Sequence, residues 1–124
     1  MAARAYLLYL EDMQEAMERI SRYCAGLDFA GFCANELVVD GVVRNLEVIG
    51  EAAKKVPLAV QQLYPQLPWS QMYRMRNRIS HEYFGLDLAT IWRVATAHLP
   101  QNYPDLLRAL AAERARQGTD AAEG

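Results

Sequence analysis

Apolar side chains recur at every third or fourth position along most of this chain, and this spacing restricts the fold more than any other feature. In the first segment they stand at successive intervals of 4, 3, 4, 3 and 4 residues: Tyr6, Leu10, Met13, Met17, Ile20 and Cys24. Such a stripe covers one face of an α-helix, whereas a half-buried strand would alternate polar and apolar residues. The spacing predicts a helix that stops near Gly26, and strand-like alternation is found nowhere in the sequence.

Stop signals divide the middle of the chain into two longer helices. After a connector with one possible helical turn, Asn35 is placed to cap a second helix that runs to about Val56, where Pro57 ends it. Between Pro57 and Pro68 we expect a turn or a short helix. Pro68 suits the first turn of a third helix, which should run to about Tyr83 and stop at Gly85.

The last third of the chain predicts two more helices. Asp87 can cap a fourth helix that ends before Pro100, and Pro104 can open a last one. Helices joined by short connections favour an all-α, up-and-down bundle of four or five helices. We expect residues 1–117 to form one domain and residues 118–124 to be a disordered tail, because the tail is small and polar.

Glycines inside the second predicted helix indicate close packing. Gly41 and Gly50 each cost a helix about 1 kcal/mol relative to alanine, so a neighbouring helix should approach closely there. The expected inward face of this helix contains eight residues: Leu37, Val38, Gly41, Val42, Asn45, Val48, Ile49 and Ala52.

Charge and composition exclude several kinds of protein. The net charge of −2 means that any contact with nucleic acid must be local, and a helix with a continuous basic face for binding membranes is absent. Neither a secretory signal nor an apolar run near the ~20 residues of a membrane span is visible, so we expect a soluble, cytoplasmic protein. Cys24 and Cys33 lack further ligands for a zinc site, and we predict no metal and no cofactor.

Chemically active side chains concentrate in residues 75–84, within the third predicted helix. Arg76 interrupts the apolar face formed by Trp69, Met72, Ile79 and Tyr83. A guanidinium stays charged, so burying it without an anion costs several kcal/mol. Its partner is either a carboxylate of the second helix or a substrate phosphate, which arginine can grip through two parallel hydrogen bonds. The candidate carboxylates are Glu47 and Glu51.

His81 follows Arg76 by five residues, about 140° around an unbroken helix. The two side chains can share a site if the helix ends near Ser80, or if two copies of the helix meet across a twofold axis. Without further information, an arginine and a histidine on such a helix are more often structural than catalytic. Arg74 and Arg78 form a second basic pair, and its ordinary interpretation is a solvated surface.

Several segments together resemble the HepT-like branch of the HEPN superfamily. The resemblance extends from about Tyr6 to Pro100, and the Arg-x4-His-x-Tyr pattern is its specific part. The matching segments follow the order expected for that family: Ile49–Pro57, Leu67–Trp69, Met75–Phe84, Asp87, Trp92 and Leu99–Pro100.

The resemblance implies a homodimeric, metal-independent endoribonuclease that is the toxin of a type VII-like HEPN/MNT toxin–antitoxin pair. Its partner would be an MNT-type minimal nucleotidyltransferase, which neutralises the toxin by adenylylating the motif tyrosine, here Tyr83. Position in the motif assigns catalysis to Arg76 and His81. A histidine can act as a general base or acid, arginine can stabilise a charged phosphate, and Asn77 can orient either group.

A second interpretation assigns no catalysis to the motif. In this alternative the chain is a non-catalytic HEPN module that docks on a nucleotidyltransferase and uses the Arg76 segment only to build its dimer. An Arg76–glutamate ion pair sealed from solvent, with His81 pointing away, would favour the module. An open basic cleft where two Arg76–His81 sets converge would favour the enzyme.

Overall fold

A computed structural model describes residues 2–82 and 87–123 of the chain, with the side chains of residues 5–78 and 87–118. All regular elements within these residues are helices, which confirms the predicted all-α class. The helices are α1 (Ala2–Cys24), α2 (Phe29–Cys33), α3 (Glu36–Lys55), α4 (Leu58–Gln61), α5 (Trp69–Glu82), α6 (Leu88–Arg93), the π-helix η2 (Val94–His98) and α7 (Leu99–Glu123).

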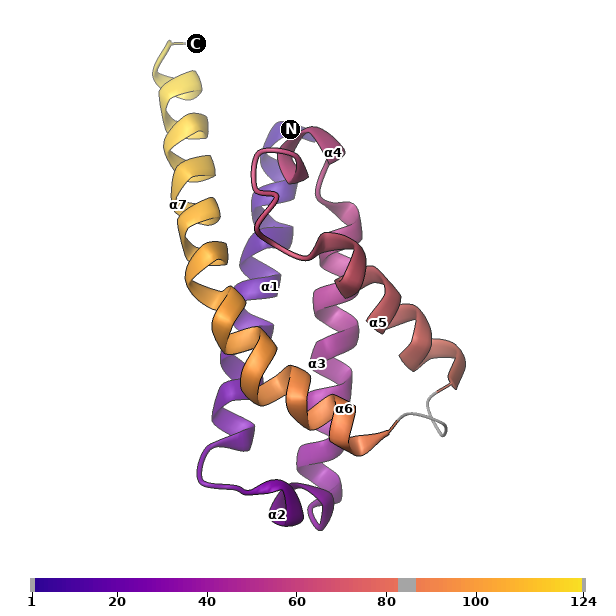
Figure 1. Cartoon of the computed structure of the whole chain (residues 1–124). Helices are drawn as coiled ribbons and strands as arrows, with labels where there is room; N and C mark the ends of the chain where they lie inside the picture. Colours follow the sequence, from indigo (N-terminus) through magenta and orange to yellow (C-terminus); the bar gives the residue numbers. More distant parts are fainter. Residues whose placement is uncertain (1, 83–86, 124) are drawn as a thin grey trace.

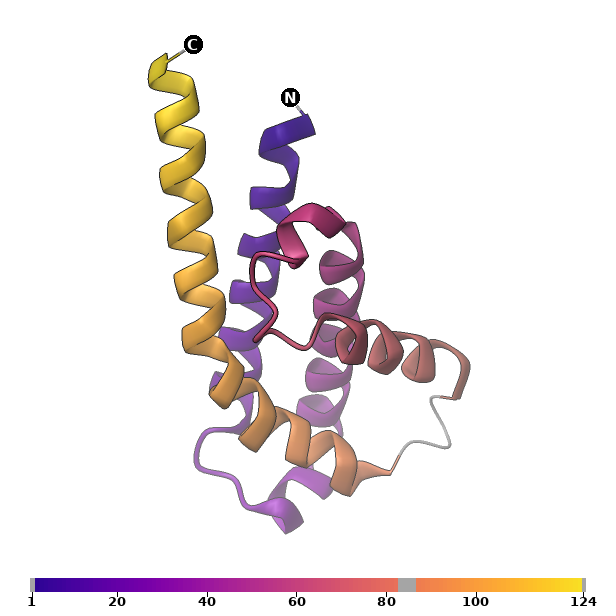
Figure 2. The ribbon, with the colours of Figure 1, turned by 45° about the horizontal axis from the view of Figure 1, so that its top comes forward.

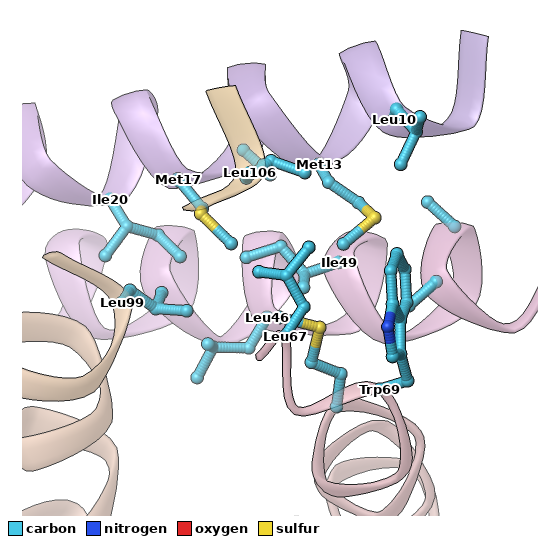
Figure 3. Packing of buried hydrophobic residues seen from close by; sticks show 14 of the residues in the cluster. Leu10, Met13, Met17, Ile20, Leu46, Ile49, Leu67, Trp69, Leu99 and Leu106 are labelled. Atoms are coloured by element: carbon cyan, nitrogen blue, oxygen red, sulfur yellow. The ribbon is translucent and has the colours of Figure 1, made fainter. Parts of the chain in front are cut away.

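The bundle is built around α1 and α3. These two helices run side by side in opposite directions, α7 lies along α1, and α5 packs across α3 (Figures 1 and 2). The start of α1 and the end of α7 lie at the same end of the molecule (Figure 1). Apolar side chains from these helices meet in one core (Figure 3). The core includes the predicted α1 stripe from Tyr6 to Cys24, all of whose six members are buried.

Local capping signals were predicted correctly. The Asn35 side chain accepts a hydrogen bond from the Val38 amide at 3.1 Å and caps α3. The Asp87 carboxylate accepts one from the Ala89 amide at 3.0 Å and caps α6. Gly26, two residues after α1, has a φ of 78°, which favours glycine. These signals are local, so the sequence alone specifies them.

The buried face of α3 differs from the predicted one, since it also includes Val43, Leu46 and Ala53 and does not reach the start of the helix. Val42, Asn45, Ile49 and Ala52 are buried as expected, but Leu37 is 85% exposed. It lies in the first turn of α3, beyond the part of the helix that faces α5 and the middle of α1 (Figure 1).

The predicted boundary between a fourth and a last helix is wrong. α6, η2 and α7 follow one another without a gap, and Pro104 lies inside α7. The ring of a helical proline clashes with the carbonyl four residues earlier, which for Pro100 is that of Thr96. Thr96 belongs to the wider turn of η2, and this turn accommodates the ring. Burial of Leu106 and Leu110 stabilises the helix beyond Pro104. Disorder of residues 118–124 remains a prediction.

A buried carboxylate ties three parts of the bundle together. Glu113 of α7 is fully buried and accepts hydrogen bonds from Tyr6 Oη at 2.6 Å and from Tyr64 Oη at 2.5 Å. Arg116 Nη1 lies 3.4 Å from the same carboxylate. Glu113 therefore joins α1, the segment after α4, and α7. This role of Glu113 was not predicted from the sequence, although Glu113 continues the helical spacing of Leu110 and thus falls on the buried face.

Replacing Glu113 by alanine is expected to lower the free energy of unfolding by about 3 kcal/mol, because the buried Tyr6 and the half-buried Tyr64 lose their acceptor and a cavity remains. Glu15→Ala is the control, since Glu15 is exposed and its ion pair with Arg19 lies at the surface; it should change stability by less than about 0.5 kcal/mol. Urea unfolding measures both. Equal stabilities of the two variants would show that the buried network contributes little.

The same network predicts a loss of stability at high pH. Burial, and next the hydrogen bond to Glu113, raise the pKa of Tyr64 from 10.0 to about 12. The folded state thus holds this proton more tightly than the unfolded chain. The resulting stabilisation is complete below pH 10.0 and is lost as the pH rises towards about 12.

Candidate active site

The motif arginine is carried by α5, whose first turns are fixed in the core. Trp69 and Met72 are buried, and Trp69 Nε1 donates a hydrogen bond to the Tyr64 carbonyl at 3.0 Å. Pro68 precedes the helix, as predicted, and its carbonyl accepts from the Met72 amide at 3.1 Å. The N-terminal half of α5 is thereby held against α3.

Gly50 sets the distance between α3 and α5. A Cβ atom at this position would lie 2.3 Å from Arg76 Cβ and 2.6 Å from the Met72 carbonyl oxygen. The predicted close approach is therefore confirmed, and the neighbour is the motif helix itself. At Gly41, the other predicted position, the Tyr23 ring lies 3.0 Å from such an atom. The absence of a side chain at Gly50 places the stem of Arg76 directly on the α3 backbone.

Gly50→Ala is expected to lower the free energy of unfolding by about 1–3 kcal/mol, because the added methyl group meets backbone that cannot move aside alone. Gly118→Ala is a matched control on α7, where nothing lies within 4 Å of the added atom. Higher helix propensity should make that control up to about 1 kcal/mol more stable. Thermal or urea unfolding measures the stability of both variants. A Gly50→Ala protein as stable as the Gly118→Ala protein would contradict the proposed contact.

Arg76 as a whole is half-buried, and its guanidinium has an amide neighbour. Arg76 Nη1 donates to Asn77 Oδ1 at 3.4 Å. Among the side chains of residues 5–78 and 87–118, Arg76 has no carboxylate within ion-pair distance, so neither Glu47 nor Glu51 is its partner. Its charge is thus available to an anion from outside the described part of the chain.

The structure describes less of His81 and Tyr83 than of Arg76. His81 lies in the last turn of α5, but its side chain is outside the described residues, and Tyr83 lies outside them altogether. α5 continues to Glu82, so the helix does not end near Ser80, and that route to a shared site is wrong. The His81 position stays about 140° around α5 from Arg76. Among the described side chains, the structure therefore brings Arg76 together with Asn77.

Neither a cluster of metal ligands nor a membrane-spanning helix is found among the described residues. No group of three or more histidine, cysteine or carboxylate side chains is gathered there in a way that suits a metal ion. The helices described also include none with the length and apolar character needed to cross a membrane.

Comparison with known proteins identifies the family. The family model described as ribonuclease HepT-like matches residues 13–112, which include α5 and the whole Arg76–Tyr83 segment. The chain belongs to the HepT-like ribonuclease family. This confirms the predicted resemblance and makes the chain a ribonuclease by class.

Individual relatives cover most of the chain. A provisionally named ribonuclease HepT of Thermococcus cleftensis is 37% identical over 97 residues, covering 78% of this chain and 88% of its own. A provisionally named RNase of Methanocaldococcus jannaschii is 36% identical over 101 residues, covering 82% and 84%. One from Caldanaerobacter subterraneus is 31% identical over 93 residues, covering 75% and 83%. No solved structure matches the chain at a significant level.

Proposed function

We propose that this HepT-like protein is a metal-independent endoribonuclease that works in the cytoplasm as a homodimer. It is the toxin of a toxin–antitoxin pair, and an MNT-type nucleotidyltransferase is its antitoxin. The proposal rests on the contacts that Arg76 makes and on the ion pair that it lacks within the described part of the chain. The stem of Arg76 is anchored over Gly50, and its guanidinium contacts Asn77 and has no carboxylate partner among the described side chains. A phosphate of RNA is the anion that a ribonuclease would supply to it.

The proposed reaction needs only what RNA and these side chains provide. The 2′-oxygen attacks the adjacent phosphorus while the phosphorus–O5′ bond breaks, leaving a 2′,3′-cyclic phosphate and a 5′-hydroxyl. His81 takes the proton of the 2′-hydroxyl, and an acid returns a proton to O5′. Arg76, oriented by Asn77, stabilises the charge that develops on the phosphate oxygens. The internal nucleophile is already held beside the phosphorus, so a metal-bound water is not needed.

The geometry of α5 supports a site shared by two copies. Arg76 and the His81 position are about 140° apart on one continuous helix. Across a twofold axis, Arg76 of one copy can face His81 of the other, and the two sites are equivalent. The apolar content of 52% leaves material for such an interface besides the core.

The non-catalytic module has less support. That alternative called for an ion pair between Arg76 and a glutamate sealed from solvent. Neither Glu47 nor Glu51 makes this pair, and Arg76 is only partly buried.

Cleavage of RNA in excess EDTA tests the proposed function. The full-length protein should cut single-stranded RNA with undiminished rate and leave 2′,3′-cyclic phosphate ends, which mass spectrometry of the fragments identifies. An all-deoxy strand of the same sequence should stay intact because it lacks the nucleophile. Loss of cleavage in EDTA, restored by adding a divalent metal ion, would contradict the mechanism.

A further inference from the structure

A groove runs between α5 and the helical segment that continues from α6 into α7. Figure 3 shows α5 and the Leu99 end of α7 on the same side of α3, and the groove lies between them. It encloses about 350 Å³. Its floor is apolar and includes Leu46 and Ile49 of α3 and Met72 of α5. Its polar lining residues are Gln71, Arg74, Arg78, Thr90, His98 and Asn102.

The charge of the groove is opposite to that of the chain. Two arginines and a histidine line it, and among the side chains that the structure describes no aspartate or glutamate does so. The protein as a whole has a net charge of −2. Such a local basic surface on an acidic chain favours an anionic ligand.

The two arginines of the groove belong to those arginines that make no ion pair with a described carboxylate. Arg19, Arg108, Arg114 and Arg116 all pair with carboxylates, on α1 and α7. Among the described side chains no such partner is found for Arg74 or Arg78, and both are exposed. They are four residues apart on α5, so their side chains stand one turn apart on the same face. Both guanidinium groups are thus free to bind phosphate.

The residues that line the groove suit one nucleotide of a single-stranded RNA. Exposed guanidinium groups bind phosphodiester oxygens, an apolar floor accepts the face of an unstacked base, and amides such as Gln71 and Asn102 can bond to a base edge. An inorganic anion alone would make no use of the floor. The spacing along α5 also indicates where a bound RNA strand would lead. The His81 position follows Arg74 and Arg78 by seven and three residues, so it lies on the same helical face as both arginines.

We propose that this groove is an RNA subsite that holds a nucleotide next to the scissile bond, with its phosphates on Arg74 and Arg78 and its base on the apolar floor. The subsite rests on the proposed ribonuclease function and adds binding residues that are separate from Arg76. A strand lying along this face of α5 leads directly to the position of His81.

Binding of an RNA that cannot be cut tests the subsite independently of catalysis. The probe is a fluorescent single-stranded oligonucleotide with a 2′-O-methyl group on every ribose, followed by anisotropy at several salt concentrations. Arg74→Gln/Arg78→Gln should weaken binding at least ~10-fold and reduce the salt dependence by ~0.7 per lost phosphate contact. Arg19→Gln/Arg114→Gln is the matched control, with the same change of net charge at exposed arginines outside the groove. It should bind within about twofold of the original protein.

Each other outcome overturns the subsite. Unchanged binding by the groove variant would do so, and so would equal weakening by the control variant, since the effect would then be one of total charge. An abasic strand that binds as tightly as the normal one would show that the base does not contact the apolar floor of the groove. Failure of the proposed function appears separately: the unmodified RNA would then stay uncut by the original protein, whatever the anisotropy shows.

Discussion

Replacing either Arg76 or His81 by alanine is expected to lower the rate of RNA cleavage at least ~10²-fold while the helical fold survives. Arg76→Ala removes the group that stabilises the phosphate, and His81→Ala removes the proton acceptor. Arg76 makes no ion pair with a described carboxylate, so its loss leaves no buried charge uncompensated. Single-turnover cleavage of a labelled RNA measures the effect, with circular dichroism as the check on folding.

Arg19→Ala is the matched control for the Arg76 variant, because Arg19 lies on α1 and pairs with exposed Glu15. Its cleavage rate should stay within about twofold of the original. Arg76→Lys adds a finer test: it keeps the charge but loses the two parallel hydrogen bonds, so it should recover only part of the rate. A folded Arg76→Ala or His81→Ala protein that cleaves RNA at the original rate would exclude that residue from the chemical step.

Adenylylation of Tyr83 is expected to abolish cleavage to a similar extent. In this step the phenol oxygen forms a bond to the α-phosphorus of ATP, pyrophosphate leaves, and the phenolic proton is released. The product carries a bulky group and a negative charge two residues after His81. Both the volume and the charge compete with the RNA phosphate, and Arg76 can itself bind the new phosphate.

The test of this switch uses the full-length protein, its candidate nucleotidyltransferase and ATP. Peptide mass spectrometry should find one or more AMP units on Tyr83, with RNA cleavage falling in parallel. Tyr83→Phe should remain unmodified and active under the same conditions. Modification confined to another residue, or full ribonuclease activity after Tyr83 is saturated, would show that this switch does not operate.

The helices and their caps could be predicted from sequence because the signals are local. Asn35 and Asp87 bond to amides within three residues of themselves, and the α1 stripe follows directly from helical spacing. The helix boundary predicted at Pro100 was wrong because this boundary is not set by local signals. Whether a helix continues through a proline depends on a wider turn before it and on core packing after it, and neither is visible in the residues at the proline.

The site shows the same division between local and tertiary information. The motif residues and the importance of Gly50 were predicted, but the sequence did not reveal that the helix packed on Gly50 is the one that carries Arg76. It also predicted only a solvated pair for Arg74 and Arg78. They form a groove because the chain after α6 returns beside α5 and brings in His98, twenty residues beyond Arg78.

Mixing two inactive variants tests the shared site most directly. Arg76→Ala and His81→Ala proteins are unfolded together, refolded and checked by light scattering for a mass twice the 14.0 kDa of the chain. If Arg76 of one copy works with His81 of the other, each mixed dimer has one intact site, and random pairing should restore about a quarter of the original activity. Either variant refolded alone should stay inactive. A mixture of proven dimers that cleaves no RNA, or a chain that remains a monomer, would contradict the account.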